Sequence, residues 1–286
     1  MSRFKPGDKV VTLFNQGHLA GSMTNGILQT GLGGSADGTL REYAALSEQG
    51  LVKVPANLSL VEAATLPCAA VTAWNALYGL ESRGLKPGHT VLTQGTGGVS
   101  IFAVQFAKAA GARVIATTSS AEKVELLKKL GADHVINYKE TPNWGEKAKE
   151  LTPDGHGVEH VVEVGGPTTL KQSLNAIAFD GVISKWPTTV PFTYTYIDHF
   201  LAIIGFVGGF SKDQPSFLDC LSHQCTVRGL LVGSRLMFED MNAAIEQNDI
   251  HPVVDEKVFQ LSELKEAYQY MFDQKHFGKL CVKIGN

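Results

Sequence analysis

The 286-residue sequence has few cysteines, no excess of basic residues, no long apolar run and no apolar leader. Its four cysteines do not form the disulfide framework of small secreted domains, and no two have the spacing of a zinc knuckle, so we expect free thiols. Lysine and arginine total 25 against 28 acidic residues, which argues against nucleic acid as a main partner. No uncharged apolar stretch approaches the about 20 residues of a transmembrane helix, and residues 1–8 lack a signal core. We therefore predict a cytoplasmic protein without a membrane span.

The middle of the chain alternates short β-branched runs with helical patterns, and 44 % hydrophobic residues supply a substantial core. The expected strands are 90–93, 113–117, 134–137, 160–164, 181–184 and 226–232, and the expected helices are 99–110, 121–130, 144–151 and 168–177. This alternation predicts an α/β fold with a doubly wound parallel sheet. Nearly all-apolar strands are typical of a sheet with helices on both faces.

The two flanking segments have a different pattern. The first 60 residues are rich in glycine and contain short extended stretches, at 8–13, 39–45 and 51–54. The last 52 residues predict helices over 238–247 and 262–272 and extended segments over 253–259 and 279–284. The flanks therefore predict an irregular β unit outside the alternating region.

A glycine-rich turn joins the first strand of the alternating region to its helix. It reads Gly95-Thr96-Gly97-Gly98-Val99-Ser100, and a second strand begins at Arg113. Gly95 permits the tight turn, Gly97 lets the backbone approach a pyrophosphate, and the helix N-terminus supplies free N–H groups. Ser100 stands at the third glycine position, where we expect slightly looser helix–strand packing. In this strand–turn–helix setting the pattern predicts a dinucleotide site.

The end of the second strand carries the signal for the choice of cofactor. NAD-preferring sites place an acidic residue there, whereas this sequence has Thr117-Thr118-Ser119-Ser120-Ala121-Glu122-Lys123. Hydroxyls and a cation can accommodate a 2′-phosphate, which a carboxylate would repel. A lysine so near a helix N-terminus opposes the helix dipole, which indicates a function, although a solvated surface lysine is the alternative. We predict NADP(H) rather than NAD(H).

Further motifs run along nearly the whole chain. They are Phe4-Lys5-Pro6-Gly7-Asp8-Lys9-Val10, Asp37-Gly38-Thr39-Leu40-Arg41-Glu42-Tyr43, Ala63-Ala64-Thr65-Leu66-Pro67-Cys68, Leu85-Lys86-Pro87-Gly88, Leu130-Gly131-Ala132-Asp133 and His276-Phe277-Gly278-Lys279. With the glycine turn, they resemble the medium-chain dehydrogenase/reductase superfamily, in its quinone-oxidoreductase-like and zinc-type alcohol dehydrogenase-like branch. The resemblance implies a Rossmann doubly wound parallel sheet plus a partial GroES-like β domain. It divides the chain into a partial GroES-like domain (1–68), an NADP-binding Rossmann domain (69–234) and a return to the GroES-like domain (235–286).

The resemblance also implies roles for individual residues. Thr72 is similar to the residue beside the nicotinamide and is the one candidate at the catalytic site, as a positioning residue. The residues implied at the cofactor are Gly97, Gly98 and Val99 at the pyrophosphate, Ser119, Ser120, Lys123 and Tyr138 at the adenosine phosphate, Gly165, Gly205 and Phe206 at the nicotinamide, and Lys279 near the phosphates. A capping role for Tyr138, and ordinary strand-end or surface roles for the last four, are the alternatives.

Zinc is not expected, despite the name of the branch. Cys68 stands where zinc-dependent relatives have their third catalytic ligand, but one cysteine cannot form a site that needs three protein ligands. His156 and His160 are four residues apart, yet they fall in a loop and at a strand start. We therefore predict no metal site.

Two segments depart from the family pattern. In relatives the motif at Phe4 follows a segment that supplies the first strands of the β domain, so we expect exposed strand edges and apolar surface here. Residues 185–202 contain Pro187 and Pro191 and interrupt the expected fifth strand, where proline is disfavoured. We hypothesise that both departures come from an incorrect gene model; a genuine insertion is the alternative, and transcript sequencing across 185–202 would decide between them.

The leading functional prediction is a zinc-independent, NADP(H)-dependent oxidoreductase. It would transfer a hydride between the nicotinamide and a carbonyl, enone or quinone in a small-molecule substrate. The alternatives are a zinc-type alcohol dehydrogenase and an inactive nucleotide-binding relative without a complete substrate domain. The resemblance further suggests a homodimer through the edge strand at 226–232.

Overall fold

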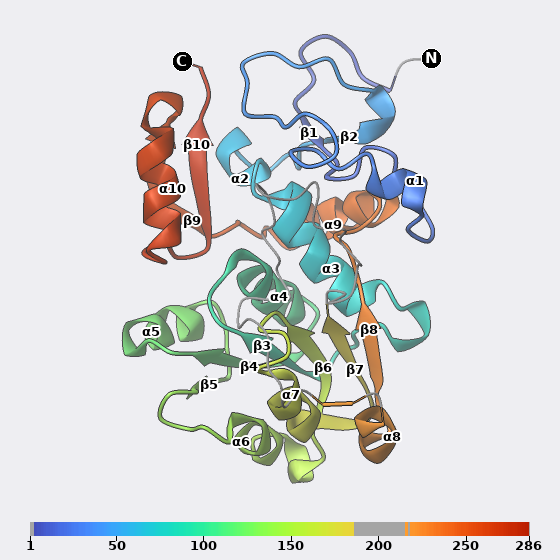
Figure 1. The fold of residues 1–286 in the computed structure, drawn as a ribbon, viewed down its shortest axis with the longest axis vertical. Helices are drawn as coiled ribbons and strands as arrows, with labels where there is room; N and C mark the ends of the chain where they lie inside the picture. Colours follow the sequence, from blue (N-terminus) through green and yellow to red (C-terminus); the bar gives the residue numbers. More distant parts are fainter. Residues whose placement is uncertain (1–2, 186–214, 217, 286) are drawn as a thin grey trace. The chain divides into compact units, whose positions relative to one another are not determined.

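The computed structural model describes residues 3–185, 215, 216 and 218–285 and divides into two compact units (Figure 1). Unit 1 comprises Met1–Thr72 and Val232–Asn286, and unit 2 comprises Ala73–Leu231. The predicted site residues Gly205 and Phe206 lie outside the described residues, as does the predicted insertion beyond residue 185. In the described part of the chain, no helix is long and apolar enough to cross a bilayer.

Unit 2 contains a six-stranded parallel sheet with the order β5-β4-β3-β6-β7-β8 (Figure 1). Its strands are β3 (Thr90–Gln94), β4 (Arg113–Thr118), β5 (His134–Asn137), β6 (Val158–Glu163), β7 (Ile177–Lys185) and β8 (Thr226–Gly229). Counted from β3, this is the order 3-2-1-4-5-6 of the dinucleotide-binding fold. The predicted doubly wound sheet is confirmed. Only its last strand is clearly shorter than expected, and Val232 beyond it adopts a left-handed φ of 47°.

Helices connect the strands of unit 2 and bury its core. They are α4 (Gly98–Ala109), α5 (Ala121–Lys129), α6 (Trp144–Glu150), α7 (Leu170–Ala176) and α8 (Asp219–His223), with short 3₁₀ turns at Glu81–Arg83 and Pro153–Gly155. Helix α4 packs on β3 and β4, α5 packs on β4 and β5, and α6 contacts α7. Trp144 of α6 and Leu174 of α7 pack on Leu92, Ile115 and Ile183 of the sheet. The predicted helical segments are therefore present with small shifts of their ends.

Unit 1 has two small sheets instead of one large one. Strands β1 (Val10–Thr12) and β2 (Leu51–Lys53) pair antiparallel, and β9 (Val254–Gln260) pairs parallel with β10 (Lys279–Lys283). Its helices are α1 (Asn25–Leu28), α2 (Leu60–Ala63), a π-helical turn (Leu66–Ala70), the start of α3 (Val71–Tyr78), α9 (Arg235–Gln247) and α10 (Leu264–Phe272), with 3₁₀ turns at Glu48–Gly50 and Leu261–Glu263. The helical run from α2 to α3 is not among the predicted elements.

The predicted extended stretch at 39–45 is wrong. The structure assigns no strand to these residues, and most of them are exposed. Arg41 instead forms an ion pair with Asp37 at 3.0 Å within the same segment. An extended segment becomes a strand only when a neighbour satisfies its backbone groups, and among the described residues none pairs with this one.

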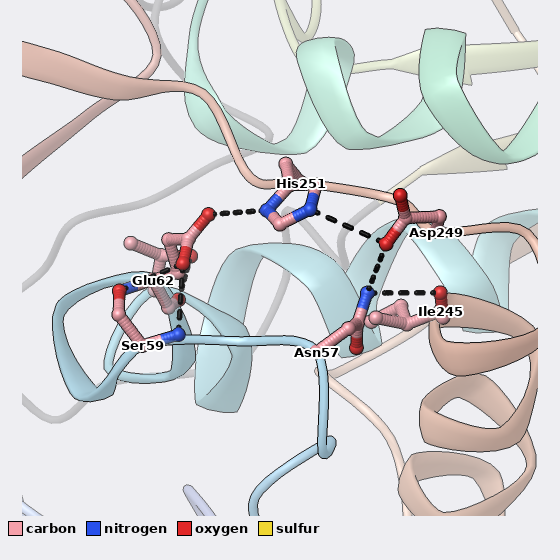
Figure 2. Close-up of polar contacts among 7 residues, drawn as sticks. Asn57, Ser59, Glu62, Ile245, Asp249 and His251 are labelled. Carbon is pink, nitrogen blue, oxygen red and sulfur yellow. Dashed lines mark hydrogen bonds and ion pairs between the residues drawn. The ribbon is translucent and has the colours of Figure 1, made fainter.

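A polar network in unit 1 joins the segment before α2 to the segment after α9 (Figure 2). Ser59 and Glu62 form a capping box at the start of α2, and Glu62 Oε1 lies 2.7 Å from His251 Nδ1. The other ring nitrogen of His251 lies 3.4 Å from Asp249, whose carboxylate accepts from the Asn57 amide at 3.3 Å. The hydrogen bond to Glu62 raises the pKa of His251. Residues nearly 190 positions apart are thereby linked by hydrogen bonds at the surface of unit 1.

The amino-terminal end of the large sheet buries a histidine. His160 of β6 is 3 % exposed and lies against the His89 ring, with the ring centroids 5.5 Å apart and the ring planes tilted by 31°. Its Nδ1 atom has no hydrogen-bond partner among the described residues. Burial, followed by the neighbouring His89, lowers the pKa of His160 to about 4. The ring is therefore held neutral in the folded state.

This histidine predicts a loss of stability on acidification. Because the folded-state pKa lies below the ordinary value of 6.5, the unfolded chain binds the proton first, and stability falls as the pH drops from 6.5 towards 4. The full difference corresponds to about 3 kcal/mol at most. Urea unfolding at a series of pH values should show that the free energy of unfolding falls less on acidification for His160→Gln than for the wild type.

His156→Gln is the matched control. Hydrogen bonding to the Pro153 carbonyl and to Glu159 raises the pKa of His156, so this ring stabilises the fold at low pH. Replacing His156 by glutamine should therefore increase the loss of unfolding free energy at low pH. An unchanged pH profile for His160→Gln would contradict the assignment.

Candidate functional site

The candidate site lies at the carboxyl ends of β3 and β6. These two strands are adjacent, but the chain continues from β3 towards β4 and β5 and from β6 towards β7 and β8. Parallel sheets of this kind bind ligands at such a switch point, outside the carboxyl ends of the strands. The Gly95 turn follows β3, and the loop at Val164–Gly166 follows β6.

The Gly95 turn has the geometry that a phosphate requires. Gly95 adopts a φ of 72°, and an added Cβ at Gly95 or Gly97 would meet no heavy atom within 4 Å in the described structure. Gly97 precedes α4, whose N-terminus no described side chain caps. Ser100 donates from Oγ to the Gln94 carbonyl at 2.6 Å, so the residue at the third glycine position bonds helix to strand. The turn therefore offers open space beside the positive end of a 12-residue helix.

The residues predicted for the adenosine phosphate gather at the end of β4. Ser119 and Ser120 are half-buried, and no side-chain hydrogen bond caps α5 at Ser120. The Tyr138 amide donates to the Thr118 carbonyl at 3.0 Å, which brings the segment after β5 beside the same strand end. Lys123 lies in the first turn of α5 and is half-buried. The structure therefore brings this predicted group together, with no carboxylate between Thr117 and Ser120.

A buried carboxylate holds the carboxyl ends of β3 and β6 together. This role of the carboxylate is not among the predictions from sequence. Glu163 is 2 % exposed and accepts hydrogen bonds from the Gly165 and Gly166 amides at 2.9 and 2.8 Å. It also accepts from the Gln94 side chain at 2.7 Å. The hydroxyls of Thr169, at 2.5 Å, and Ser173 supply two further donors. Five donors thus satisfy one buried carboxyl group.

The Gln94 side chain completes the same network. Its Oε1 accepts from the Gly165 amide at 3.1 Å, and its Nε2 donates to Ser173 at 2.8 Å as well as to Glu163. The available sequence signal was a polar residue at the carboxyl end of each of the two strands. Position alone does not reveal this role, because the two residues are 69 apart and meet only in the sheet.

The predicted residue Gly165 lies inside this network. A Cβ there would come within 2.3 Å of Thr169 Oγ1 and 2.5 Å of its Cγ2. Glycine is required at this point because the loop packs directly on the Thr169 side chain, whereas Gly97 faces open space. Packing therefore explains the glycine at position 165, whereas no packing contact explains the glycine at position 97.

The remaining predicted residues, Thr72 and Lys279, lie in unit 1 with Cys68. Thr72 is buried, and its hydroxyl donates to the Cys68 carbonyl at 2.7 Å, at the junction of the π-helical turn and α3. Burial raises the pKa of the Cys68 thiol, and the nearby Lys279 ammonium opposes this effect. The structure therefore places these three residues together in unit 1, and the phosphate-turn residues together in unit 2. The π-helical turn is a further unpredicted feature, of a kind often found at functional sites.

The described residues do not fit a zinc ion. Within residues 3–185, 215, 216 and 218–285, no three histidine, cysteine or acidic side chains are grouped as metal ligands. The cation that acts on Cys68 is the Lys279 ammonium, which would repel a metal ion. His156 and His160 are engaged separately, with Glu159 and with His89.

Comparisons with known proteins match this architecture. The family model for zinc-binding dehydrogenases matches residues 98–185. A zinc-type alcohol dehydrogenase-like protein of Schizosaccharomyces pombe is 49 % identical over 284 residues, which are 98 % of this chain and 76 % of the relative. A candidate alcohol dehydrogenase from Sinorhizobium meliloti 1021 has a crystal structure that aligns with a TM-score of 0.82 at 37 % identity, covering 98 % of this chain and 76 % of that one. The structure of an NAD-dependent alcohol dehydrogenase aligns with a TM-score of 0.80 at 30 % identity, covering 99 % and 78 %. The predicted combination of a Rossmann sheet and a partial GroES-like domain is confirmed by these matches.

Glu163 generates a prediction about stability. Glu163→Ala should lower the free energy of unfolding by about 3–5 kcal/mol, because it leaves buried donors unpaired, and Glu163→Gln should cost about 1–3 kcal/mol, since its amide hydrogens face other donors. Glu125→Gln, which removes an exposed ion pair with Lys128 at 2.9 Å, is the control and should have a much smaller effect. Urea unfolding at pH 7 measures all three, and equal costs for Glu163→Ala and Glu125→Gln would refute the role of the network.

Proposed function

Because the chain belongs to the medium-chain dehydrogenase/reductase superfamily, in its zinc-type alcohol dehydrogenase-like branch, we propose that it is an NADP(H)-dependent, zinc-independent oxidoreductase. The family makes it an alcohol dehydrogenase-like oxidoreductase. The finer proposal is hydride transfer to or from a carbonyl, enone or quinone of a small molecule. One observation carries it: an open phosphate turn at the switch point of the sheet, beside a strand end that bears hydroxyls and no carboxylate.

A nicotinamide cofactor, when bound, supplies the hydride chemistry at C4 of its ring. The chain's own contribution is to bind and orient. Gly97 and the first amides of α4 would hold the pyrophosphate, and Ser119, Ser120 and Lys123 would hold the 2′-phosphate. Glu163 fixes the loop at Gly165, which would lie beside the nicotinamide. Thr72 is proposed as a positioning residue whose hydroxyl oxygen keeps lone pairs to accept a hydrogen bond.

The choice of cofactor rests on this chain's own residues. One structural relative is an NAD-dependent alcohol dehydrogenase, so membership of the family leaves both cofactors open. At the end of β4, a 2′-phosphate would meet hydroxyls and the N-terminus of α5, both of which favour an anion. Zinc independence is supported by the charge of Lys279 near Cys68 and by the burial that keeps this thiol protonated.

We also propose the homodimer that the family resemblance suggests. Strand β8 is an edge of the six-stranded sheet. Backbone groups at such an edge can pair with the same edge of a second copy around a twofold axis.

The first functional test compares binding with turnover. Fluorescence titration of the full 286-residue chain should show tighter binding of NADPH than of NADH, and Gly97→Ala should weaken NADPH binding at least about tenfold, or 1.4 kcal/mol, while leaving the melting temperature unchanged. Gly165→Ala is the matched control and should lower the melting temperature because its Cβ clashes with Thr169.

Turnover of NADPH with simple quinones and aldehydes, unchanged by EDTA, would support the complete proposal. Binding without turnover on any of these substrates would favour the inactive nucleotide-binding relative. Activity lost to EDTA and restored by zinc would instead favour a zinc-type alcohol dehydrogenase.

A second test concerns cofactor selectivity. Ser119→Asp places a carboxylate where the 2′-phosphate is proposed to lie, so the ratio of NADPH to NADH affinity should fall by about tenfold or more, about 1.4 kcal/mol. Ser82→Asp introduces the same charge on an exposed 3₁₀ turn and should leave the ratio unchanged. If the ratio of NADPH to NADH affinity were equal in the two variants, the 2′-phosphate would not lie at Ser119.

A further inference from the structure

Two thiols of unit 2 face one another across the end of a short helix. Cys220 lies in α8, Cys225 lies just before β8, and their side chains are hydrogen-bonded. Neither residue belongs to the phosphate turn, the β4 end or the Glu163 network, so the proposed reaction does not use them.

Backbone geometry holds the two residues in place. Gln224 adopts the left-handed conformation, with φ 45° and ψ 49°, and ends α8. The Cys225 amide donates to the Cys220 carbonyl and the Gln224 amide donates to the Leu221 carbonyl, both at 3.2 Å. These two bonds form a Schellman motif, which brings together the side chains at the positions of Cys220 and Cys225. The turn thus holds the two hydrogen-bonded thiols side by side, and closure to a disulfide requires such close approach of the two side chains.

We propose that Cys220 and Cys225 are an oxidation site that closes to an intrachain disulfide on reaction with a hydroperoxide. In the first step the Cys220 thiolate attacks a peroxide oxygen. The new S–O bond replaces the O–O bond, and the second oxygen leaves as water or an alcohol. In the second step the Cys225 sulfur attacks the sulfenic sulfur. The S–S bond forms, the S–O bond breaks, and the oxygen leaves as water with the Cys225 proton. Two thiols are oxidised by two electrons and one peroxide is reduced.

The environment of the pair sets the order of these steps. Burial, and then the neighbouring Cys220, raise the pKa of Cys225 to about 11. Because the thiolate is the nucleophile, a thiol that stays protonated near neutral pH is a poor first attacker. It is suited to the second step, where its proton goes to the departing oxygen. Cys220 is therefore assigned the attack on the peroxide.

The position of the site gives the disulfide a structural consequence. The Gln224 carbonyl between the two cysteines accepts from the Asp180 amide of β7 at 2.8 Å, and Thr226 begins the edge strand β8. A disulfide would tie both ends of this turn.

The other two cysteines, Cys68 and Cys281, lie in unit 1, where burial raises the pKa of each thiol. They serve as internal references.

The test uses the full chain and one tryptic peptide. Cleavage after Lys212 and Arg228 releases residues 213–228, which contain both cysteines and no cleavage site between them. The reduced protein is treated with equimolar hydrogen peroxide, alkylated with iodoacetamide and digested. We expect this peptide to lose two hydrogen atoms and carry no alkyl group, while the Cys68 and Cys281 peptides are alkylated. Dithiothreitol should restore double alkylation of the peptide.

Two serine variants test the order of the steps. In Cys225→Ser, dimedone should trap a sulfenic acid at Cys220, whereas in Cys220→Ser the Cys225 thiol should stay alkylatable at the same peroxide dose. Double alkylation of the wild-type peptide, at a dose that oxidises N-acetylcysteine, overturns the proposal. Oxygen addition to the peptide without loss of two hydrogens overturns it as well, as does a disulfide from either cysteine to Cys68 or Cys281.

Discussion

The architecture of the candidate site depends on the buried carboxylate of Glu163. A carboxyl group that is 2 % exposed is tolerated only if hydrogen bonds replace its water, and five donors from β3, from α7 and from the loops around them do so. Each donor is fixed in position by the same carboxylate. The Gly165 loop, the Gln94 side chain and the start of α7 are therefore held in one arrangement, and the phosphate turn begins directly after Gln94. Hydrogen bonds to buried polar groups hold this edge of the sheet in place, because glycine-rich loops have few side chains to pack.

The two ends of the six-stranded sheet use buried polar groups in opposite ways. At the carboxyl end, the Glu163 side chain accepts five hydrogen bonds. At the amino end, His160 is neutral, lies against the His89 ring and is short of one hydrogen bond among the described residues. The first arrangement fixes the loops of the candidate site, and the second is the basis of the expected loss of stability in acid. Both residues belong to β6, the strand at the switch point.

The predicted site residues fall into two groups that follow the division of the chain. The phosphate turn, the β4 end and the Gly165 loop belong to unit 2, whereas Thr72, Cys68 and Lys279 belong to unit 1. Within unit 1, the Lys279 ammonium opposes the rise that burial causes in the pKa of the Cys68 thiol.

Local sequence was enough to predict the doubly wound sheet, the glycine-rich turn and the hydroxyls at the end of β4. These features depend on local order along the chain: apolar periodicity, glycines at fixed spacing, and residue types directly after a strand. The other features depend on contacts that form only when the chain folds. Glu163 and Gln94 are 69 residues apart and meet because β3 and β6 are neighbours, and Cys220 faces Cys225 because Gln224 adopts a left-handed turn. The stretch at 39–45, which we expected to be extended, forms no strand, since strand formation requires a partner that local sequence does not specify.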